Sequence, residues 1–535
     1  MPYRFITYLT KLNTLYVGTL LFIVTLFCYA NTLGNGLFFD DQQFIYDNQA
    51  VKTFDVPALF GRSLISGGGK LSNYYRPLLF TGFALEYQVF ADNGFIYHFN
   101  SALTHFFGGL FLYLLIKKLF KNNALALLTS LLFLIHPVQT EAVSYASGRG
   151  DPLSFMFVML TLLLSLAKTK KYLLYALACF IAALLSKEAA IITPGLIFLV
   201  HVFKEKSFNK LTLKKSLLIT LPFIAVAAIY FLLRISVFNF SNTLNFYNTT
   251  NAYSGSLFVR LNTFFQLFPM YVQLLIFPKD LFMERDSGIS IYTAPTIQSV
   301  GTVIGLIIAF LLAYIKKGTL PVLLFGLVWI MITFIPTSGI IPINGIFYEH
   351  FLYYPSVGFF LISSSGILYL INKASPWIKE IISICLLLAI LAFCIRTISR
   401  NTEWHDPIVF YNQTLSHVKS SRAYNNLAMA YADAGQNKEA INTYKKAIDL
   451  ADAYPESHFN LANTYMAISD ITTAEKEYKK ALEIDPGFYP AYGTLYRLYK
   501  TSSNTEGLSW VSATLTKLGR QNPNFLKYLH QLQTQ

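Results

Sequence analysis

The sequence predicts an all-α protein, in which a polytopic bundle of transmembrane helices is followed by a C-terminal domain of helical repeats. Composition is the first observation behind this prediction, since 54% of the 535 residues are hydrophobic and only 13% are charged. An ordinary soluble domain has about 25% charged residues. The second observation is that apolar segments of membrane-spanning length recur between residues 12 and 396. The third is a motif that repeats near the C-terminus.

Basic residues orient the predicted spans. Lysines gather in short loops between the apolar segments, at residues 117–121, 168–171, 204–215 and 316–317. Loops rich in Lys and Arg stay on the cytoplasmic side of a membrane. This rule accounts for the formal net charge of +14, so we predict no nucleic-acid partner. It also places the N-terminus in the cytoplasm and the first long loop, residues 31–97, on the external side.

We expect about eleven spans, at residues 12–30, 98–116, 123–141, 152–167, 172–186, 189–203, 216–235, 294–315, 319–336, 351–371 and 377–396. Two further apolar stretches, 77–90 and 257–278, are expected to be interfacial or re-entrant. The second of these carries Arg260 and several amide side chains, and an amphipathic helix of this kind lies in the membrane interface. With this count the C-terminal domain lies outside, opposite the N-terminus.

The chain changes character after residue 400, where charged and alanine-rich sequence replaces the apolar segments. A motif of small and aromatic residues recurs with a period of 34 residues, so that Leu427 and Ala428 correspond to Leu461 and Ala462. This is the tetratricopeptide repeat (TPR) pattern, in which small residues let two helices touch. The predicted boundaries are 1–400 for the membrane domain, 401–535 for the TPR domain, and about 421–454, 455–488 and 489–522 for two good repeats and one degenerate repeat.

Two adjacent acids, Asp40 and Asp41, follow directly on the first predicted span. Charges held close to lipid are costly and mark a functional site by default. Adjacent acids in a loop are often only solvated, so further polar groups decide between these alternatives. Such groups lie on the external side or in the outer or buried parts of the predicted spans: Tyr75, Arg76, His98, His105, His136, Glu141, Arg149, Asp151, Lys187, Glu188, Glu349 and His350.

The chemistry of this set favours one kind of reaction. A carboxylate can take a proton from a hydroxyl group as general base, and cations can stabilise a departing phosphate. Simpler explanations exist, since Lys187 and Glu188 could neutralise each other. The histidines could be hydrogen-bonding residues inside the bundle. A zinc site of His98, His105 and His136 lacks the usual ligand spacing.

Six ordered blocks of the sequence resemble the transmembrane and TPR repeat-containing family of protein O-mannosyltransferases. They are Phe39-Asp40-Asp41 with Ile45 and Asn48, Tyr75-Arg76-Pro77-Leu78, His136-Pro137 with Thr140-Glu141, Gly148-Arg149 with Asp151, Ser186-Lys187-Glu188, and Glu349 with Leu352-Tyr353 and Pro355-Ser356. The family looks like a branch of the GT-C glycosyltransferases, which are multi-span enzymes that use polyprenyl-phosphate sugars. The resemblance covers nearly the whole chain.

The resemblance implies roles for individual residues. Asp40 or Asp41 would be the catalytic carboxylate, and Arg149 and Lys187 would lie near the phosphate of the donor lipid. His350 stands where the family usually has Arg, so it is expected to be the third residue that binds the donor phosphate, and donor binding is expected to differ here. The residues expected to shape the site are Tyr75, Arg76, His98, His105, His136, Glu141, Asp151, Glu188, Glu349 and Tyr353. No protein metal site is predicted, although a divalent metal remains compatible with the resemblance.

The repeats suggest how an acceptor binds. Asn426 and Asn460 occupy the same repeat position, and an amide can both donate to and accept from an extended peptide backbone; alternatively, this position is simply solvated. The predicted function is transfer of mannose or another hexose from a polyprenyl-phosphate carrier to a hydroxyl, with Ser or Thr of exported polypeptides in the TPR groove as acceptor. The alternative is a non-catalytic, membrane-anchored TPR scaffold for envelope assembly.

Overall fold

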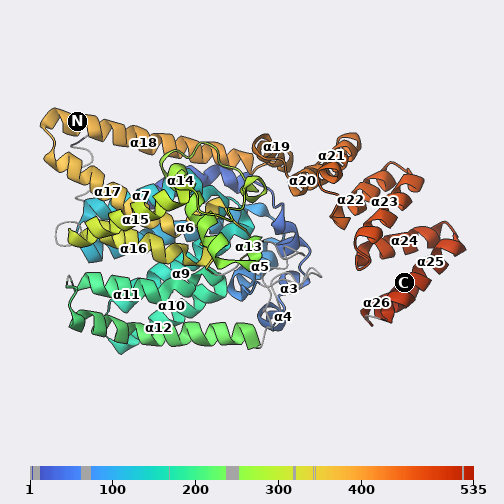
Figure 1. Ribbon diagram of the computed structural model, residues 1–535, viewed down its shortest axis with the longest axis horizontal. Coiled ribbons are helices and arrows are strands. Elements are labelled where there is room, and N and C mark those ends of the chain that lie inside the picture. Colours follow the sequence, from blue (N-terminus) through green and yellow to red (C-terminus); the bar gives the residue numbers. More distant parts are fainter. Residues whose placement is uncertain are drawn as a thin grey trace. The chain divides into compact units, whose positions relative to one another are not determined.

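The computed structural model describes residues 3, 12–61, 74–167, 169–205, 207–236, 252–316, 321–340, 343, 345–520 and 523–534. Parts of the predicted basic loops, and residues 62–73 of the first external loop, therefore lie outside the described residues. The chain forms two compact units, Met1–Asp406 and Pro407–Gln535. All regular elements of the described residues are helices, which confirms the predicted all-α class (Figure 1).

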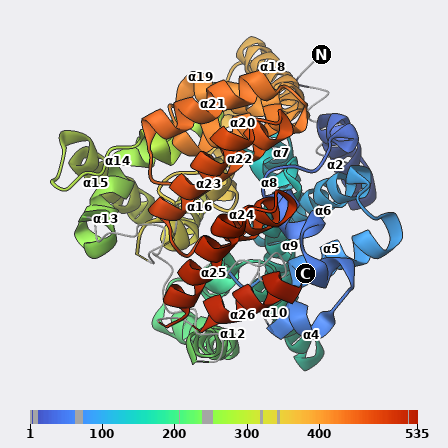
Figure 2. The same cartoon turned by 90° about the vertical axis from the view of Figure 1, so that its right-hand side faces the viewer.

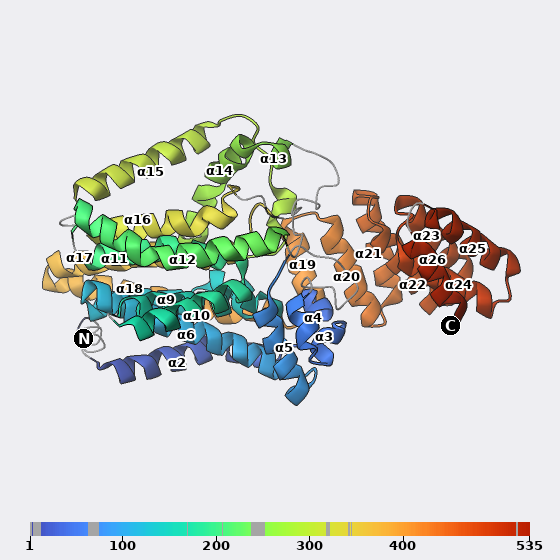
Figure 3. The ribbon, with the colours of Figure 1, turned by 90° about the horizontal axis from the view of Figure 1, so that it is seen from below.

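The helices of the first unit are α2 (Thr14–Tyr29), α3 (Gln49–Lys52), α4 (Val56–Gly61), α5 (Pro77–Phe90), α6 (Gly94–Phe120), α7 (Asn123–Ile135), α8 (Thr140–Val143), α9 (Gly150–Ser165), α10 (Lys170–Ser186), α11 (Thr193–Lys204), α12 (Lys210–Ser236), α13 (Ala252–Gly255), α14 (Leu257–Ile276), α15 (Ile297–Ile315), α16 (Pro321–Phe334), α17 (Pro355–Lys373) and α18 (Pro376–Glu403). Among the short 3₁₀ helices between them, four carry site residues: η5 (Ala146–Arg149), η6 (Glu188–Ile192), η7 (Arg285–Gly288) and η9 (Glu349–Leu352). Figure 3 shows the long helices of this unit running side by side.

Six helical segments of the described chain are long and apolar enough to cross a membrane, namely α2 with the turn after it, α6, α12, α15, α17 and α18. The bent pair of α7 with Pro137–Val143 is a candidate seventh. The protein is therefore an integral, multi-pass membrane protein. Each of the remaining four predicted spans coincides with a shorter helix, α9, α10, α11 or α16. A helix rises about 1.5 Å per residue, so these helices alone do not reach across a full bilayer core, and the number of crossings stays a prediction.

Close helix contacts in the first unit depend on small residues. On α16 and α17, a Cβ added at Gly358 would lie 2.5 Å from the Gly326 carbonyl oxygen, closer than any real contact. Only glycine lets the two backbones approach this closely. Inside a membrane the hydrophobic effect does not drive helices together, and close packing at small residues takes its place. The positions of small residues in the sequence thus help to determine which helices of the bundle pack together.

The second unit consists of α19 (Pro407–His417), α20 (Ser421–Asp433), α21 (Asn437–Leu450), α22 (Pro455–Ala467), α23 (Ile471–Ile484), α24 (Tyr489–Thr501), α25 (Thr505–Gly519) and α26 (Asn524–Thr534). From α20 onward these helices form successive pairs (Figure 2). Ala428 and Ala440 are fully buried where α20 meets α21, and Tyr444 packs in the same cluster as Leu461 of the next pair. This is the packing that the repeat motif predicts.

Candidate active site

The loop after α2 holds its two aspartates in different ways. Asp41 is 1% exposed, and its carboxylate accepts hydrogen bonds from the Ser147 backbone N–H at 2.8 Å and from the Ser147 hydroxyl. The backbone N–H of Phe38 donates to the other Asp41 oxygen at 3.3 Å. Asp40 is only half-buried, and its backbone N–H donates to the Tyr145 hydroxyl at 3.1 Å. Asp41 therefore anchors the loop on η5, while Asp40 is less deeply buried and its side chain bonds to the Tyr145 hydroxyl.

The backbone just before this pair is strained. Phe39 has a φ of 62°, in the left-handed region that residues with a large side chain rarely adopt. Such strain persists only where surrounding contacts determine the conformation, and the Asp41–Ser147 bonds provide them. Burial raises the pKa of Asp41 to about 7, because the hydrogen bonds that favour its charged form offset only part of the desolvation.

Five charged residues form a first group, called here the Arg76 cluster: Arg76, Asp151, Lys187, Glu188 and Arg234. The Arg76 Nε lies 3.0 Å from a Glu188 carboxylate oxygen, and the Lys187 Nζ lies 2.5 Å from an Asp151 oxygen. The Arg234 guanidinium, in the last turn of α12, lies 3.7 Å from Glu188. Burial alone would raise the pKa of Glu188, but Arg76 and Arg234 lower it below its usual value.

Three cations and two carboxylates give the Arg76 cluster a formal charge of +1, so it suits an additional anion. The expectation that Lys187 and Glu188 might merely neutralise each other is wrong, because each pairs with a different residue. Tyr75 belongs to the same surroundings, since its backbone N–H donates to Glu188 at 3.1 Å. Arg234 belongs to none of the motifs, although a single arginine near the end of an apolar segment indicates a functional charge.

Arg149, which the resemblance places at the donor phosphate, is engaged elsewhere in this structure. Its guanidinium forms a bidentate ion pair with Glu86 of α5, one of whose two bonds measures 2.9 Å. The Arg149 Nε also donates to the Ser101 hydroxyl at 3.2 Å, and Phe83 lies 4.7 Å beneath the guanidinium. Contact with a phosphate would require Arg149 to exchange these partners. Sequence reasoning missed Glu86, although it is an acid inside an apolar segment.

A second group, called here the Glu349 cluster, comprises Glu141, Arg285, Glu349, His350 and Arg400. The His350 Nδ1 lies 2.7 Å from Glu141, whose other oxygen accepts from the His350 backbone N–H at 3.0 Å. Arg285 and Arg400 each lie 3.7 Å from Glu349. Burial raises the pKa of Glu349 to about 7, with Glu141 adding repulsion and the two arginines opposing it. His350 thus bonds to Glu141 here, and Arg285 and Arg400 are cations that the motifs did not predict.

Asp40 acts on two tyrosine hydroxyls, those of Tyr145 and Tyr74. The Tyr145 ring stacks on Trp404 with centroids 5.4 Å apart, and the Arg400 guanidinium lies 5.8 Å from the Trp404 ring. The Tyr74 ring lies 4.9 Å from the Arg76 guanidinium. Burial raises the pKa of the Tyr74 hydroxyl. The Arg76 guanidinium lowers this pKa and the Asp40 carboxylate raises it, so both charged groups act on Tyr74. Tyr74 therefore lies within electrostatic reach of both the Asp40 carboxylate and the Arg76 guanidinium.

The three histidines do not converge. The His98 Nε2 lies 3.4 Å from the Gly36 carbonyl oxygen, and the His136 Nε2 lies 3.2 Å from that of Leu275. His105 bridges the Tyr353 hydroxyl, at 2.6 Å, and the Leu134 carbonyl, at 3.1 Å. They act as hydrogen-bonding residues of the bundle, which is the simpler of the two explanations that the sequence allowed. Within the described ranges no three His, Cys, Asp or Glu side chains gather as metal ligands.

Comparisons with known proteins extend these observations. Two family models of the tetratricopeptide repeat match residues 428–469 and 455–488. Protein O-mannosyl-transferase TMTC3 of Homo sapiens is 26% identical over 97% of this chain and 60% of its own length. Protein O-mannosyl-transferase F38B6.6 of Caenorhabditis elegans is 27% identical over 80% of this chain and 62% of its own length. The resemblance that the motifs predict is therefore confirmed over nearly the whole chain.

A solved structure is also similar in part. The crystal structure of ArnT from Cupriavidus metallidurans, bound to undecaprenyl phosphate, aligns with 90% of this chain and 80% of its own, with 12% identity and a TM-score of 0.42. A superposition of this quality assigns neither site residues nor function. The chain also spans only about 60% of the length of the human relative, so an activity is inferred from its own site.

Proposed function

We propose that this protein is a membrane glycosyltransferase that moves a sugar, mannose or another hexose, from a polyprenyl-phosphate carrier to the hydroxyl of Ser or Thr in an exported polypeptide. The observation that carries this proposal is at Tyr74, whose ring lies 4.9 Å from the Arg76 guanidinium and whose pKa is raised by the half-buried Asp40 carboxylate. A carboxylate and a cluster with a formal charge of +1 therefore both act on the same hydroxyl. The similarity to protein O-mannosyl-transferases over 97% of the chain supports the same class.

The two aspartates take different roles in the proposed reaction. Asp40 is the general base, because it is the less buried of the two aspartates, while Asp41 is 1% exposed and accepts three hydrogen bonds from its own protein. Asp40 takes the proton of the acceptor hydroxyl as the hydroxyl oxygen bonds to the anomeric carbon. The bond from that carbon to the phosphate oxygen breaks, and the direct displacement inverts the configuration. Asp41 is a positioning residue that holds the loop on η5.

The Arg76 cluster receives the phosphate of the donor in this proposal. Arg234 is the best placed cation, since its helix, α12, is a candidate span of which only 17% is buried inside the protein, so that lipid can reach it. Arg76 and Lys187 add charge-assisted hydrogen bonds to the phosphate that develops as the sugar leaves. Arg149, which is ion-paired with Glu86, supports the fold of α5 instead.

The acceptor polypeptide binds the TPR unit in this proposal, along Asn426 of α20 and Asn460 of α22. Both side chains are half-buried on the first helices of successive pairs. Tethering the acceptor near the membrane unit raises its effective concentration without adding chemistry. The same proposal puts the N-terminus in the cytoplasm and the TPR unit on the external side of the membrane.

Glycopeptide mass spectrometry on exported proteins tests the proposal, with wild type compared with the Asp40→Asn variant at matched abundance. Loss of hexose from Ser and Thr supports the enzyme, the acceptor class and the catalytic carboxylate together. Asp47→Asn, an exposed aspartate in the same loop, is the matched control and should behave as wild type. Unchanged glycopeptides together with an envelope defect on deletion of the chain would instead support the non-catalytic scaffold. Repeating purified transfer with a chelator tests whether a divalent metal takes part.

A further inference from the structure

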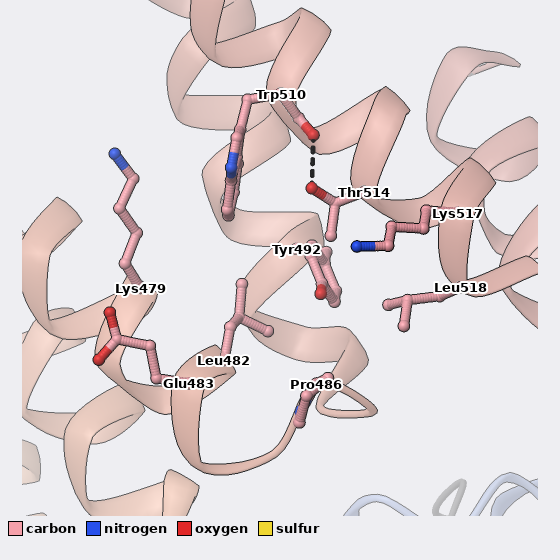
Figure 4. Close-up of a pocket in the computed structure, with 9 residues that line it drawn as sticks. All are labelled: Lys479, Leu482, Glu483, Pro486, Tyr492, Trp510, Thr514, Lys517 and Leu518. Atoms are coloured by element: carbon pink, nitrogen blue, oxygen red, sulfur yellow. Dashed lines mark hydrogen bonds between the residues drawn. The ribbon is translucent and has the colours of Figure 1, made fainter.

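The TPR unit contains a pocket that the proposed transfer reaction does not use. It has a volume of about 450 Å³ and is lined by Lys479, Leu482, Glu483, Pro486, Tyr492, Trp510, Thr514, Lys517 and Leu518 (Figure 4). These residues come from α23, the start of α24 and α25. The pocket thus lies between the second helices of two successive pairs, whereas Asn426 and Asn460 are on first helices. It is a separate feature from the predicted peptide groove.

The interior of this pocket is apolar and aromatic. Tyr492 is 2% exposed and Leu482 is 7% exposed, while the Trp510 side chain stands 39% exposed above them. The two aromatic rings lie 6.4 Å apart and are tilted by 34°, so they form two walls of one cavity (Figure 4). Exposure of the Trp510 ring to water is unfavourable, because burying an aromatic ring lowers the free energy. An apolar group of aromatic size can pack on the exposed face of Trp510, above Leu482.

The charges at the mouth are unequal. Lys479 is already paired, since its ammonium lies 2.7 Å from Glu475 and 5.6 Å from the Trp510 ring centroid. Lys517 is exposed, and in the part of the chain that the structure describes no carboxylate lies within ion-pair distance of it. Figure 4 shows Lys517 and Lys479 on opposite sides of Tyr492, with Glu483 beside Lys479. A carboxylate on an occupant is therefore favoured at the Lys517 end alone.

We propose that this pocket between α23 and α25 binds a peptide segment in which an aromatic side chain is followed closely by an acidic residue. The aromatic ring packs on the exposed face of Trp510 within the pocket, and the carboxylate pairs with Lys517. Aromatic anchors that fill an apolar pocket next to a complementary charge are the usual centres of peptide affinity. The proposal concerns binding alone and holds whether or not the membrane unit transfers sugar.

Fluorescence anisotropy of the intact protein in detergent tests the proposal. The probe is a fluorescein-labelled peptide in which one Phe is flanked by Asp and Glu residues. Two peptides serve as references, one with Phe replaced by Ser and one with the acids replaced by Lys. We expect only the acidic Phe peptide to bind, and we expect Lys517→Glu and Trp510→Ala each to weaken it about tenfold or more, as losses at an anchor do.

Lys500→Glu is the matched control, because Lys500 is an exposed lysine of α24 that does not line the pocket. Both lysines are exposed, so neither substitution removes a buried contact. Equal weakening by Lys517→Glu and Lys500→Glu, or equal binding of the Ser peptide, would overturn the proposal in favour of diffuse charge attraction. Displacement of the peptide by methyl α-mannoside would overturn it in favour of a sugar pocket.

Discussion

The ion pairs of the two units differ in how deeply they are buried. In the membrane unit, Arg149 and Glu86 form an ion pair with side chains only 5% and 8% exposed. In the TPR unit, Lys479 and Glu475 pair with 43% and 31% of their side chains exposed. For a buried ion pair, the free energy needed to remove two charges from water often exceeds the free energy of their attraction. For an exposed pair, both free energies are small. Loss of one partner should therefore destabilise the membrane unit strongly and the TPR unit only slightly.

The largest expected effect is on the buried pair. Arg149→Ala leaves the Glu86 carboxylate without its partner, and we expect a loss of about 3–5 kcal/mol of stability, the cost of an uncompensated buried charge. Thermal unfolding of the purified protein in detergent measures this loss. The matched control is Lys279→Ala, because Lys279 is exposed in the same unit. The double variant Arg149→Met/Glu86→Leu should recover most of the loss; failure to recover would show that the charges themselves hold α5 in place.

A smaller effect is expected in the Arg76 cluster. Arg234→Ala removes one of three cations proposed to hold the donor phosphate, and the KM for the polyprenyl-phosphate sugar should rise about 10- to 100-fold, the value of one charge-assisted hydrogen bond. Initial rates at varied donor concentration measure it. Lys214→Ala, an exposed lysine on the same helix, should leave KM unchanged. A fall in kcat with unchanged KM would contradict a role in donor binding.

One buried titratable residue of the TPR unit is an exception to this contrast, and its protonation leads to a prediction about pH. His458 is 2% exposed, and its ring nitrogens lie 2.6 Å from Glu477 and 2.7 Å from Asp452. Burial opposes the charged ring, but the two carboxylates prevail and raise its pKa above the usual value. A group whose pKa is higher in the folded state stabilises the fold fully below its unfolded pKa, about 6.5, and this contribution is lost as pH rises through the folded pKa.

Hydrogen exchange of α22 and α23 in the intact protein, corrected for intrinsic rates, measures this pH dependence. Protection at pH 6 should exceed protection at pH 9, and His458→Gln should remove the difference. His530→Gln is the control, because His530 is exposed on α26. Equal protection at both pH values in wild type would show that the ring is neutral in the fold.

The smallest effect is expected on the exposed pair of the repeats. Glu475→Gln leaves Lys479 in water rather than in a low-dielectric interior, so the stability should change by about 0–1 kcal/mol. The same unfolding measurement that follows Arg149→Ala gives this value. A loss as large as that of Arg149→Ala would remove the distinction between the two units.

The sequence predicts the all-α class and the repeats because both depend on local periodicity, as with the buried Ala428 and Ala440. It also identifies most charged residues of the site, since a charge in an apolar segment is conspicuous. It does not predict their partners. Glu141 and His350 meet across 209 residues, and Glu86 and Arg149 across 63. Such pairings depend on helix packing, which no local pattern encodes.

The difference between the two aspartates was also beyond prediction, for a physical reason. Asp40 and Asp41 are chemically identical neighbours, and only the left-handed conformation of Phe39 and the hydrogen bonds from Ser147 distinguish them. The sequence therefore left the base as either residue. Arg234, Arg285 and Arg400 were missed because they lie outside the recognised motif blocks, not because they lacked a signal.

The most direct test of the account is kcat for transfer from a polyprenyl-phosphate hexose at saturating donor, with Asp40→Asn and Asp41→Asn compared in parallel. We predict that Asp40→Asn lowers kcat about 10²- to 10⁴-fold, the contribution of a general base, while thermal unfolding stays as in wild type. Asp41→Asn should lower stability and reduce kcat less, because its carboxylate positions the loop. Wild-type kcat in Asp40→Asn together with no detectable transfer in a folded Asp41→Asn would contradict the account.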